Sequence, residues 1–356
     1  MVFDLASVSL YIHVPFCHEI CDFCNFVTFS NKTQHIDKYV ECLKREIQTL
    51  KDHKFHSVYF GGGTPSFIGE ERIMEILAVL DLSETVEVSV EFHPNHIGNR
   101  VLKNLKSSGV SRISLGLQSV DELVVASLGR TPHTKSYEKL SYEIKEAEFK
   151  SWSVDLILGA RSESDLAWRT NLERFLENPS PHVSGYLLTV ENGTPLYLDK
   201  DRYPIEETLF KRYFDLDSVL TGLGYEWNEI SNWSIPGHQC IHNENYWSQG
   251  NYIGVGAGAH SHLDGTRWSN TVSVEKYISH ISERKSAKAR EEVLDMNSRA
   301  FEKNWLLLRK PDGVPLDAFQ KADLLASEGL IEVDSGTAIL TVKGRVLSSL
   351  VSQYLI

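Results

Sequence analysis

The feature that most constrains this chain is a run of three cysteines near its N-terminus. Cys17, Cys21 and Cys24 have the spacing C-x3-C-x2-C. Thiolates are the usual ligands of iron–sulfur clusters, and a short cysteine run lets one loop wrap a cluster. Three thiolates hold three irons of a cubic 4Fe–4S cluster and leave the fourth iron open, which is typical of a reactive metal site. A structural zinc completed by His18 is disfavoured, because zinc ligands usually come as two separated pairs.

The same stretch resembles the signature of the radical SAM superfamily, C-x3-C-x-aromatic-C, with Phe23 in the aromatic place. In that superfamily the signature follows a first strand, and the apolar, β-prone residues 8–14 precede it here. The resemblance implies that the three cysteines bind the cluster. It also implies that the open iron takes the amino and carboxylate groups of S-adenosylmethionine (SAM).

Composition limits the partners and the location. The chain has 356 residues and a formal net charge of −12, so we expect no nucleic-acid partner. Five cysteines, three of them clustered, favour a reducing compartment, and we predict a cytoplasmic protein. The sequence has no apolar run long enough to predict a membrane span and no secretory signal pattern. Peripheral membrane contact is compatible with all of these observations.

Strand and helix patterns alternate from residue 8 onward. Short strands are expected at 57–60, 86–92, 112–117, 153–158 and 183–190, and helices at 34–50, 70–80, 97–105, 121–128, 134–148 and 164–176. Repeated units of this kind predict an α/β fold with a parallel sheet, either open or closed into a barrel.

The pattern changes after about residue 206. Helices are expected at 206–223, 274–289 and 293–308, with a stretch rich in aromatic residues, Asn, His and Gly at 224–262. The tail has a short helix, two strands around Ser335-Gly336 and a final helix, an order that resembles a winged helix. We therefore expect a core domain over residues 1–235 and a C-terminal region over 236–356 that carries a small winged-helix-like α+β domain.

Polar residues fall at or near the carboxyl ends of the predicted strands, where a βα barrel places its ligand. Glu91, Gln118 and Asp155 hold such positions, and Arg130 follows a short helix and can bind a carboxylate as a fork. Residues 61–64, Gly-Gly-Gly-Thr, follow another strand, and glycines let the backbone approach a ligand. Each signal alone has an ordinary explanation, such as a capped strand end or a tight turn.

Together these motifs resemble the oxygen-independent coproporphyrinogen III oxidase-like family of radical SAM proteins. The matching pieces are collinear to at least residue 261 and comprise Tyr11-Ile-His-Val-Pro-Phe-Cys17, Gly61-Gly-Gly-Thr-Pro-Ser66, Glu91-Phe-His-Pro-Asn95, residues 109–119, Leu128-Gly-Arg130, Asp155-Leu-Ile-Leu-Gly159 and Glu191-Asn-Gly-Thr-Pro-Leu-Tyr197. The resemblance implies a partial (β/α)6 barrel and SAM contacts at Tyr11, Phe23, Gly62, Gly63, Thr64, Glu91, Gln118, Arg130 and Asp155. One departure is Gly159-Ala160-Arg161, where the family usually has Gly-Leu-Pro.

Two features separate the branches of that family. The oxidases carry a fourth cysteine, C-x3-C-x2-C-x-C, whereas Asn25 and Phe26 follow Cys24 here. The stretch His242-Asn-Glu-Asn-Tyr246-Trp247 resembles the H-N-x-x-Y-W piece of the heme chaperone branch, HemW, where it is associated with heme binding. A neutral imidazole can ligate iron, and flat aromatic rings can pack on a macrocycle. The alternative is a buried, hydrogen-bonded corner with no ligand.

The resemblance therefore implies a radical SAM heme chaperone. Its cofactors would be a 4Fe–4S cluster, SAM and heme, and its partner a heme-accepting protein that the sequence does not identify. One alternative is an oxygen-independent coproporphyrinogen III oxidase, which decarboxylates propionates by radical chemistry; the missing fourth cysteine argues against it. Another is a radical SAM methyltransferase. The sequence assigns no catalytic residue, and fold alone does not separate these functions.

Overall fold

The computed structural model describes residues 8–356, and its main body is one twelve-stranded sheet in the order β12-β11-β10-β9-β1-β2-β3-β4-β5-β6-β8-β7. Six neighbouring parallel strands form its centre: β1 (Val8–Val14), β2 (Phe55–Gly62), β3 (Glu87–Phe92), β4 (Arg112–Gln118), β5 (Ser151–Leu158) and β6 (His182–Leu187). They pair in the order of the sequence, as short right-handed βα connections require. The expected α/β class with a parallel sheet is confirmed.

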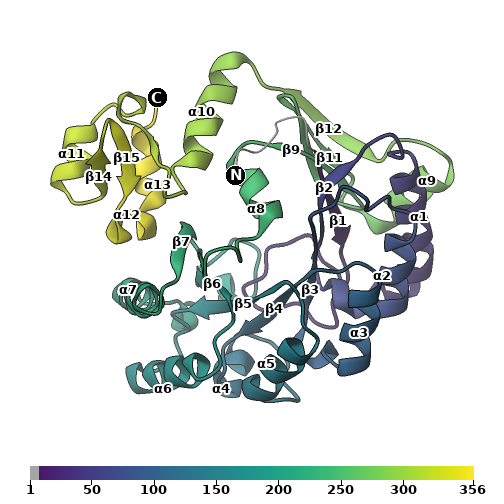
Figure 1. The fold of residues 1–356 in the computed structure, drawn as a ribbon, viewed down its shortest axis with the longest axis horizontal. Helices are drawn as coiled ribbons and strands as arrows, with labels where there is room; N and C mark the ends of the chain where they lie inside the picture. The colour runs from purple at the N-terminus through teal and green to yellow at the C-terminus, as the bar shows by residue number, and fades with distance from the viewer. Residues whose placement is uncertain (1–7) are drawn as a thin grey trace.

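Helices cover the outer face of these strands, as Figure 1 shows. They are α1 (Ile36–Gln48), α2 (Glu70–Leu77), α3 (Asn99–Ser107), α4 (Glu122–Ser127), α5 (Tyr137–Glu146), α6 (Asp165–Leu176) and α7 (Glu206–Gly222). In α1, Tyr39, Leu43 and Ile47 are buried at helical spacing against the sheet. Side chains of Asp121, Ser136 and Ser164 accept backbone hydrogen bonds at the N-termini of α4, α5 and α6, which fixes where these helices begin.

The inner face of the parallel strands is polar. Register places Tyr59 opposite Ser89, Glu91 opposite Ser114, and Asp155 opposite Ser184. The alternate residues of the same strands, such as Val58 and Val90, belong to the apolar core. Because successive side chains in a strand point to opposite faces, this alternation buries one face under helices and reserves the other for ligands.

The sheet continues beyond the boundary expected at residue 235. β9 (Asn251–Val255) pairs in parallel with β1, and β10 (His260–Leu263), β11 (Thr266–Asn270) and β12 (Lys288–Val293) extend the same sheet in antiparallel fashion. At the other edge, β8 (Asn232–Ser234) pairs with β6, and β7 (Glu226–Glu229) with β8. A division at 235 therefore cuts one sheet rather than separating two packing units.

One predicted helix is too long. The helix expected at 274–289 is α9 (Val274–Ser282), and residues 288–293 instead form the edge strand β12. The sequence of β12, Lys-Ala-Arg-Glu-Glu-Val, is rich in residues that favour helices. Its backbone hydrogen bonds with β11 outweigh this local preference.

A second, smaller apolar core lies in residues 308–355. Its sheet has the order β13 (Val314–Pro315), β15 (Thr337–Leu340), β14 (Ile331–Asp334), so a third short strand joins the two expected. The helices α11 (Ala322–Ser327), α12 (Val342–Val346) and α13 (Ser348–Val351) pack around it, and α10 (Met296–Leu307) connects it to the main body. We call residues 308–356 the small domain. No helix of the described residues is long and apolar enough to cross a membrane.

The packing of Trp233 on β8 tests this fold. Its side chain is fully buried, and its indole Nε1 donates to Asp217 on α7 over 2.8 Å. We expect Trp233→Ala to lower the free energy of unfolding by about 3–5 kcal/mol, because it leaves a large cavity. The control Trp305→Ala removes a 44% exposed indole from α10 and should cost less than about 1 kcal/mol. Urea unfolding followed by circular dichroism measures both; equal costs would contradict the described packing.

Candidate functional site

The three predicted cluster ligands lie together in the loop that follows β1. Cys17 is buried, and Cys21 and Cys24 are half-buried. The Cys17 thiol lies 3.0 Å from the Thr28 hydroxyl and 3.2 Å from the Thr64 hydroxyl. Backbone bonds from Cys17 N to Phe29 O and from Phe29 N to Pro15 O close the loop on itself.

The outer part of the loop is held by other segments of the barrel. Asp22 N donates to Leu128 O over 3.0 Å, Leu196 N donates to Asp22 O over 2.9 Å, and Arg202 pairs with the Asp22 carboxylate over 2.7 Å. Gly129 passes so close to that carboxylate that a side chain would collide with it. The β4–α5 and β6–α7 connections therefore fix the loop from outside.

The donor set fits an iron–sulfur cluster. Burial raises the pKa of the Cys21 thiol to about 11, opposed by nearby Arg130 and reinforced by Cys24 and Cys17, so the three thiols lie within electrostatic range of one another. Within residues 8–356, no three His, Cys, Asp or Glu side chains converge as ligands of a single ion. A cluster does not require such convergence, because each iron takes its own thiolate. Cys42 and Cys240 are buried elsewhere, beside α9 and Glu87.

The glycine turn at the end of β2 packs directly against this loop. Gly63 N donates to Val14 O and Thr64 N to Phe16 O, each over 2.9 Å. A Cβ on Gly63 would lie 2.6 Å from the Thr28 hydroxyl, and one on Gly62, whose φ is +113°, would lie 2.6 Å from the His13 ring. Both positions therefore need glycine, and the turn brings its backbone to the cluster side of the barrel.

Glu91 and Asp155 lie inside the barrel beyond this turn. The Tyr59 hydroxyl donates to Glu91 Oε1 over 2.9 Å, and the Ser114 hydroxyl lies 3.2 Å from Asp155 Oδ2. Burial, with the Asp155 carboxylate as a second cause, raises the pKa of Glu91 to about 8. Burial also raises the pKa of Asp155. Two buried carboxylates whose charged forms are disfavoured make a site that gains from a cationic ligand.

Arg130 and Gln118 complete the predicted site at its mouth. Arg130 Nε donates to His93 Nε2 over 3.2 Å, and its charge acts on Asp155, Cys21 and Cys24. Gln118 has a φ of +70° next to a bulge in the β4–β5 pairing, which is unusual for a residue with a side chain. The cation lies between the cysteine loop and the carboxylates, where it can bind a carboxylate group of a ligand.

Phe23 and Tyr11 take supporting positions. Phe23 is half-buried against the apolar cluster under the β6–α7 connection. The Tyr11 hydroxyl donates to His13 Nδ1 over 3.0 Å, and His13 Nε2 donates to Val27 O over 2.9 Å. His13 and Tyr59 were not predicted from the sequence. For His13 a signal was available, because it stands two residues from Tyr11 on the same strand face, whereas Tyr59 has no such spacing to a predicted site residue.

The H-N-x-x-Y-W piece forms α8 (Ile241–Trp247), which closes the base of the barrel. Glu87 at the start of β3 accepts hydrogen bonds from the backbone N–H groups of Ile241 and His242, each over 3.2 Å. His242 is fully buried, and its ring nitrogens contact the Ser57 and Tyr246 hydroxyls, each over 2.8 Å. Burial lowers the pKa of His242 to about 3, so the ring is neutral.

The three candidate heme residues do not share one face of α8. His242 and Tyr246 face the barrel, where the His242 ring stacks 5.1 Å from that of Tyr59. Trp247 faces the opposite way and lies under the guanidinium of Arg309, 4.3 Å from the ring centroid. The structure thus brings His242 and Tyr246 together as a hydrogen-bonded corner and sets Trp247 apart from them.

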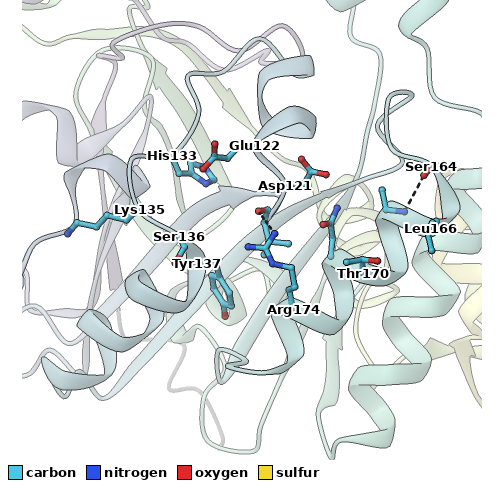
Figure 2. Close-up of a pocket in the computed structure, with 13 residues that line it drawn as sticks. Asp121, Glu122, His133, Lys135, Ser136, Tyr137, Ser164, Leu166, Thr170 and Arg174 are labelled. Atoms are coloured by element: carbon cyan, nitrogen blue, oxygen red, sulfur yellow. Dashed lines mark hydrogen bonds between the residues drawn. The ribbon is translucent and has the colours of Figure 1, made fainter.

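A cavity of ≈ 550 Å³ lies outside the barrel, between the N-terminal ends of α5 and α6 (Figure 2). His133, Ser136, Ser164 and Arg174 are among the residues that line it. None of the predicted site residues does, so this cavity is separate from the site described here.

Comparison with known proteins agrees with this geometry. The model of the Radical SAM superfamily matches residues 11–175. The heme chaperone HemW of Lactococcus lactis subsp. lactis is 34% identical over 322 residues, covering 88% of this chain and 84% of that protein. The heme chaperone HemW of Bacillus subtilis is 30% identical over 367 residues, covering 96% and 97%. The chain belongs to the HemW family.

The chain also shares its fold with a solved structure. Coproporphyrinogen III oxidase (HemN) from Escherichia coli, described as a radical SAM enzyme, superposes with a TM-score of 0.83 at 22% identity, covering 98% of this chain and 89% of that one. This likeness confirms the expected fold. The resemblance to the heme chaperone branch is confirmed by the HemW relatives.

Removal of a single loop cysteine tests the cluster site. We expect Cys17→Ala, Cys21→Ala or Cys24→Ala to remove most iron and sulfide from anaerobically reconstituted protein, because each thiolate holds one iron. Cys42→Ala is the matched control, since that thiol is buried away from the loop, and it should keep its cluster. Full retention of cluster by Cys21→Ala would contradict the assignment.

The raised pKa of Glu91 predicts a pH dependence of SAM binding. With a pKa of about 8, Glu91 is largely protonated at neutral pH, and its charged form becomes populated as the pH rises. If the carboxylate holds a cationic group of SAM, affinity should increase from about pH 6 to about pH 7.5. Glu91→Gln should bind at least about tenfold more weakly and lose this dependence. Calorimetry on cluster-loaded protein measures both, with the exposed Glu122→Gln as control; a Glu91→Gln variant with unchanged affinity and pH profile would refute the role.

Proposed function

We propose that this protein is a radical SAM heme chaperone, which binds heme and passes it to a target protein. The observation that carries the proposal is the similarity to proteins named heme chaperone HemW over nearly the whole chain, 96% of it for the Bacillus subtilis protein. The similarity includes both the cysteine loop and α8. The heme-accepting protein is not identified. We also propose that the protein is cytoplasmic. We do not propose contact with a membrane surface.

The barrel supplies sites for a 4Fe–4S cluster and SAM. Cys17, Cys21 and Cys24 would hold the cluster, which would supply the site at which SAM binds and is activated. Within the chain, the turn at Gly62 and Gly63 offers backbone groups. Glu91 and Asp155 offer negative charge to the amino and sulfonium groups of SAM, and Arg130 offers a fork to its carboxylate.

The surroundings of the loop favour a chaperone over a coproporphyrinogen III oxidase. The place of a fourth cysteine is taken by Phe26, whose side chain is 75% exposed. Neither Cys42 nor Cys240 lies near enough to replace it, because both are buried in contacts with other elements. At this position of the loop the chain therefore carries an exposed aromatic ring instead of a thiol.

Heme binding is proposed at α8, with His242 as the candidate iron ligand. In the described structure both its ring nitrogens are engaged, so ligation requires the imidazole to leave either Ser57 or Tyr246. Its neutral form, favoured by burial, is the form that ligates iron.

Heme titration and a product assay on the same anaerobic sample test the function. Wild-type protein should give a shifted Soret band and no protoporphyrinogen IX from coproporphyrinogen III. His242→Ala should change the band or weaken binding, and the control His280→Ala, which removes a half-buried ring from α9, should leave both unaltered. An unaltered spectrum and affinity in His242→Ala would leave His242 as part of a structural corner. Multiple turnovers of coproporphyrinogen III would overturn the chaperone proposal itself.

A further inference from the structure

The outer side of α8 is held by two consecutive residues of the segment that enters the small domain. The Lys310 ammonium pairs with Glu244 over 2.9 Å, and the guanidinium of Arg309 covers the Trp247 ring at 4.3 Å. Glu244 and Trp247 are three residues apart, so they share one face of the helix. We call Arg309 and Lys310 the strap.

The strap is anchored on the far side by a buried carboxylate. Arg309 Nη2 and Nε bind Glu229 Oε2 over 2.7 and 3.2 Å, and Glu229 is only 2% exposed. Glu229 also accepts hydrogen bonds from Ser231 N and from the Asn232 amide. Because a buried carboxylate is costly without its cation, this ion pair strongly favours the closed arrangement.

The flat face of Trp247 is thereby occupied. A guanidinium is planar and stacks on aromatic rings, so it takes the same surface that a porphyrin would use. The indole Nε1 of Trp247 is also buried and has no hydrogen-bond partner among the described residues. In its present position the ring therefore makes no hydrogen bond through Nε1.

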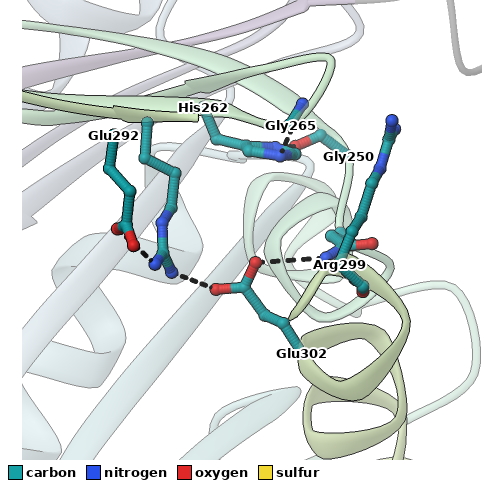
Figure 3. A network of polar contacts seen from close by, with 8 residues as sticks. Gly250, His262, Gly265, Glu292, Arg299 and Glu302 are labelled. Atoms are coloured by element: carbon teal, nitrogen blue, oxygen red, sulfur yellow. Dashed lines mark hydrogen bonds and ion pairs between the residues drawn. The ribbon is translucent and has the colours of Figure 1, made fainter. Parts of the chain in front are cut away.

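The small domain has its own apolar core and contacts the main body through both apolar and charged groups. Val342 and Val346 of α12 pack against the main core, and Trp227 and Ile230 of the main body pack against the small-domain core. Arg345 also pairs with Asp217 over 2.6 Å and stacks on Trp227 at 3.8 Å. The connecting helix α10 buries none of its residues. Glu302 in α10 is instead tied to the sheet by an ion pair with Arg267 of β11 (Figure 3), and it also accepts a hydrogen bond from Gln249 Nε2 over 3.1 Å.

We infer that the strap is an autoinhibitory contact: Arg309 must leave the Trp247 ring before that ring can pack on heme. This inference rests on the proposed heme function and adds a regulatory step to it. The two cations of the strap are 24% and 12% exposed, so raising the ionic strength should weaken their ion pairs, although less than it weakens fully exposed ones. Heme association is then limited by release of the Arg309 side chain from Trp247.

Stopped-flow heme binding to the full chain tests the strap. Arg309→Gln removes the charge, and we expect heme association to become several-fold faster and to lose its acceleration between about 0.05 and about 0.5 M salt. Glu229→Gln releases the strap from its other end and should act in the same direction, so it decides the matter if Arg309→Gln does not fold. Arg290→Gln, on the exposed edge strand β12, is the matched control and should behave as wild type.

A heme-free measurement separates failure of the strap from failure of the function. Acrylamide quenching of Trp247 fluorescence, isolated by difference from Trp247→Phe versions of each protein, should increase in Arg309→Gln. If wild-type protein binds no heme, the proposed function fails, and quenching alone decides the strap. Unchanged quenching, an unchanged association rate in both strap variants, or an equal acceleration in Arg290→Gln would overturn the inference.

Discussion

The close packing of three glycines against the first strand and the end of the cysteine loop is the constraint on which this structure depends. A Cβ on Gly63 would meet Thr28 and the backbone of Phe16, and one on Gly62 would meet His13. These contacts set the distance between the cysteines and the barrel interior. They also fix the Cys17 thiol, through hydroxyls that come from the loop and from the turn.

The polar inner face of the parallel sheet follows from the same geometry. Parallel strands covered by helices are usually apolar on both faces, but here alternate residues are Tyr, Ser, Glu and Asp. These polar side chains form hydrogen bonds between neighbouring strands, and Glu87 accepts hydrogen bonds from backbone N–H groups at the N-terminus of α8. Burial raises the pKa values of Glu91 and Asp155 and so disfavours their charged forms. A cationic ligand would stabilise those charged forms, because a nearby opposite charge lowers the pKa of a carboxyl group.

Much of this arrangement could be predicted from the sequence, and the failures have physical causes. The six central strands and their helices follow from periodicity, and the cysteine spacing indicates the cluster loop. Periodicity does not show pairing between distant segments, so the addition of β9 to β1 and the strand at 288–293 were missed. Likewise, no helix was predicted at 241–247, and it is the helix that separates His242 from Trp247, since five residues turn an α-helix by about 140° beyond one full turn. Arg309 carries no sequence motif at all, and only the fold places it over Trp247.

Cys17, Cys21 and Cys24 would together hold a 4Fe–4S cluster and leave it able to bind SAM. Electron paramagnetic resonance of the chemically reduced, cluster-loaded protein tests this most directly, because the signal reports the coordination of the cluster itself. The account predicts that SAM changes the spectrum of wild-type protein, and that the change is reduced in Glu91→Gln at the same SAM concentration. A reduced cluster whose spectrum stays the same at saturating SAM would contradict the account.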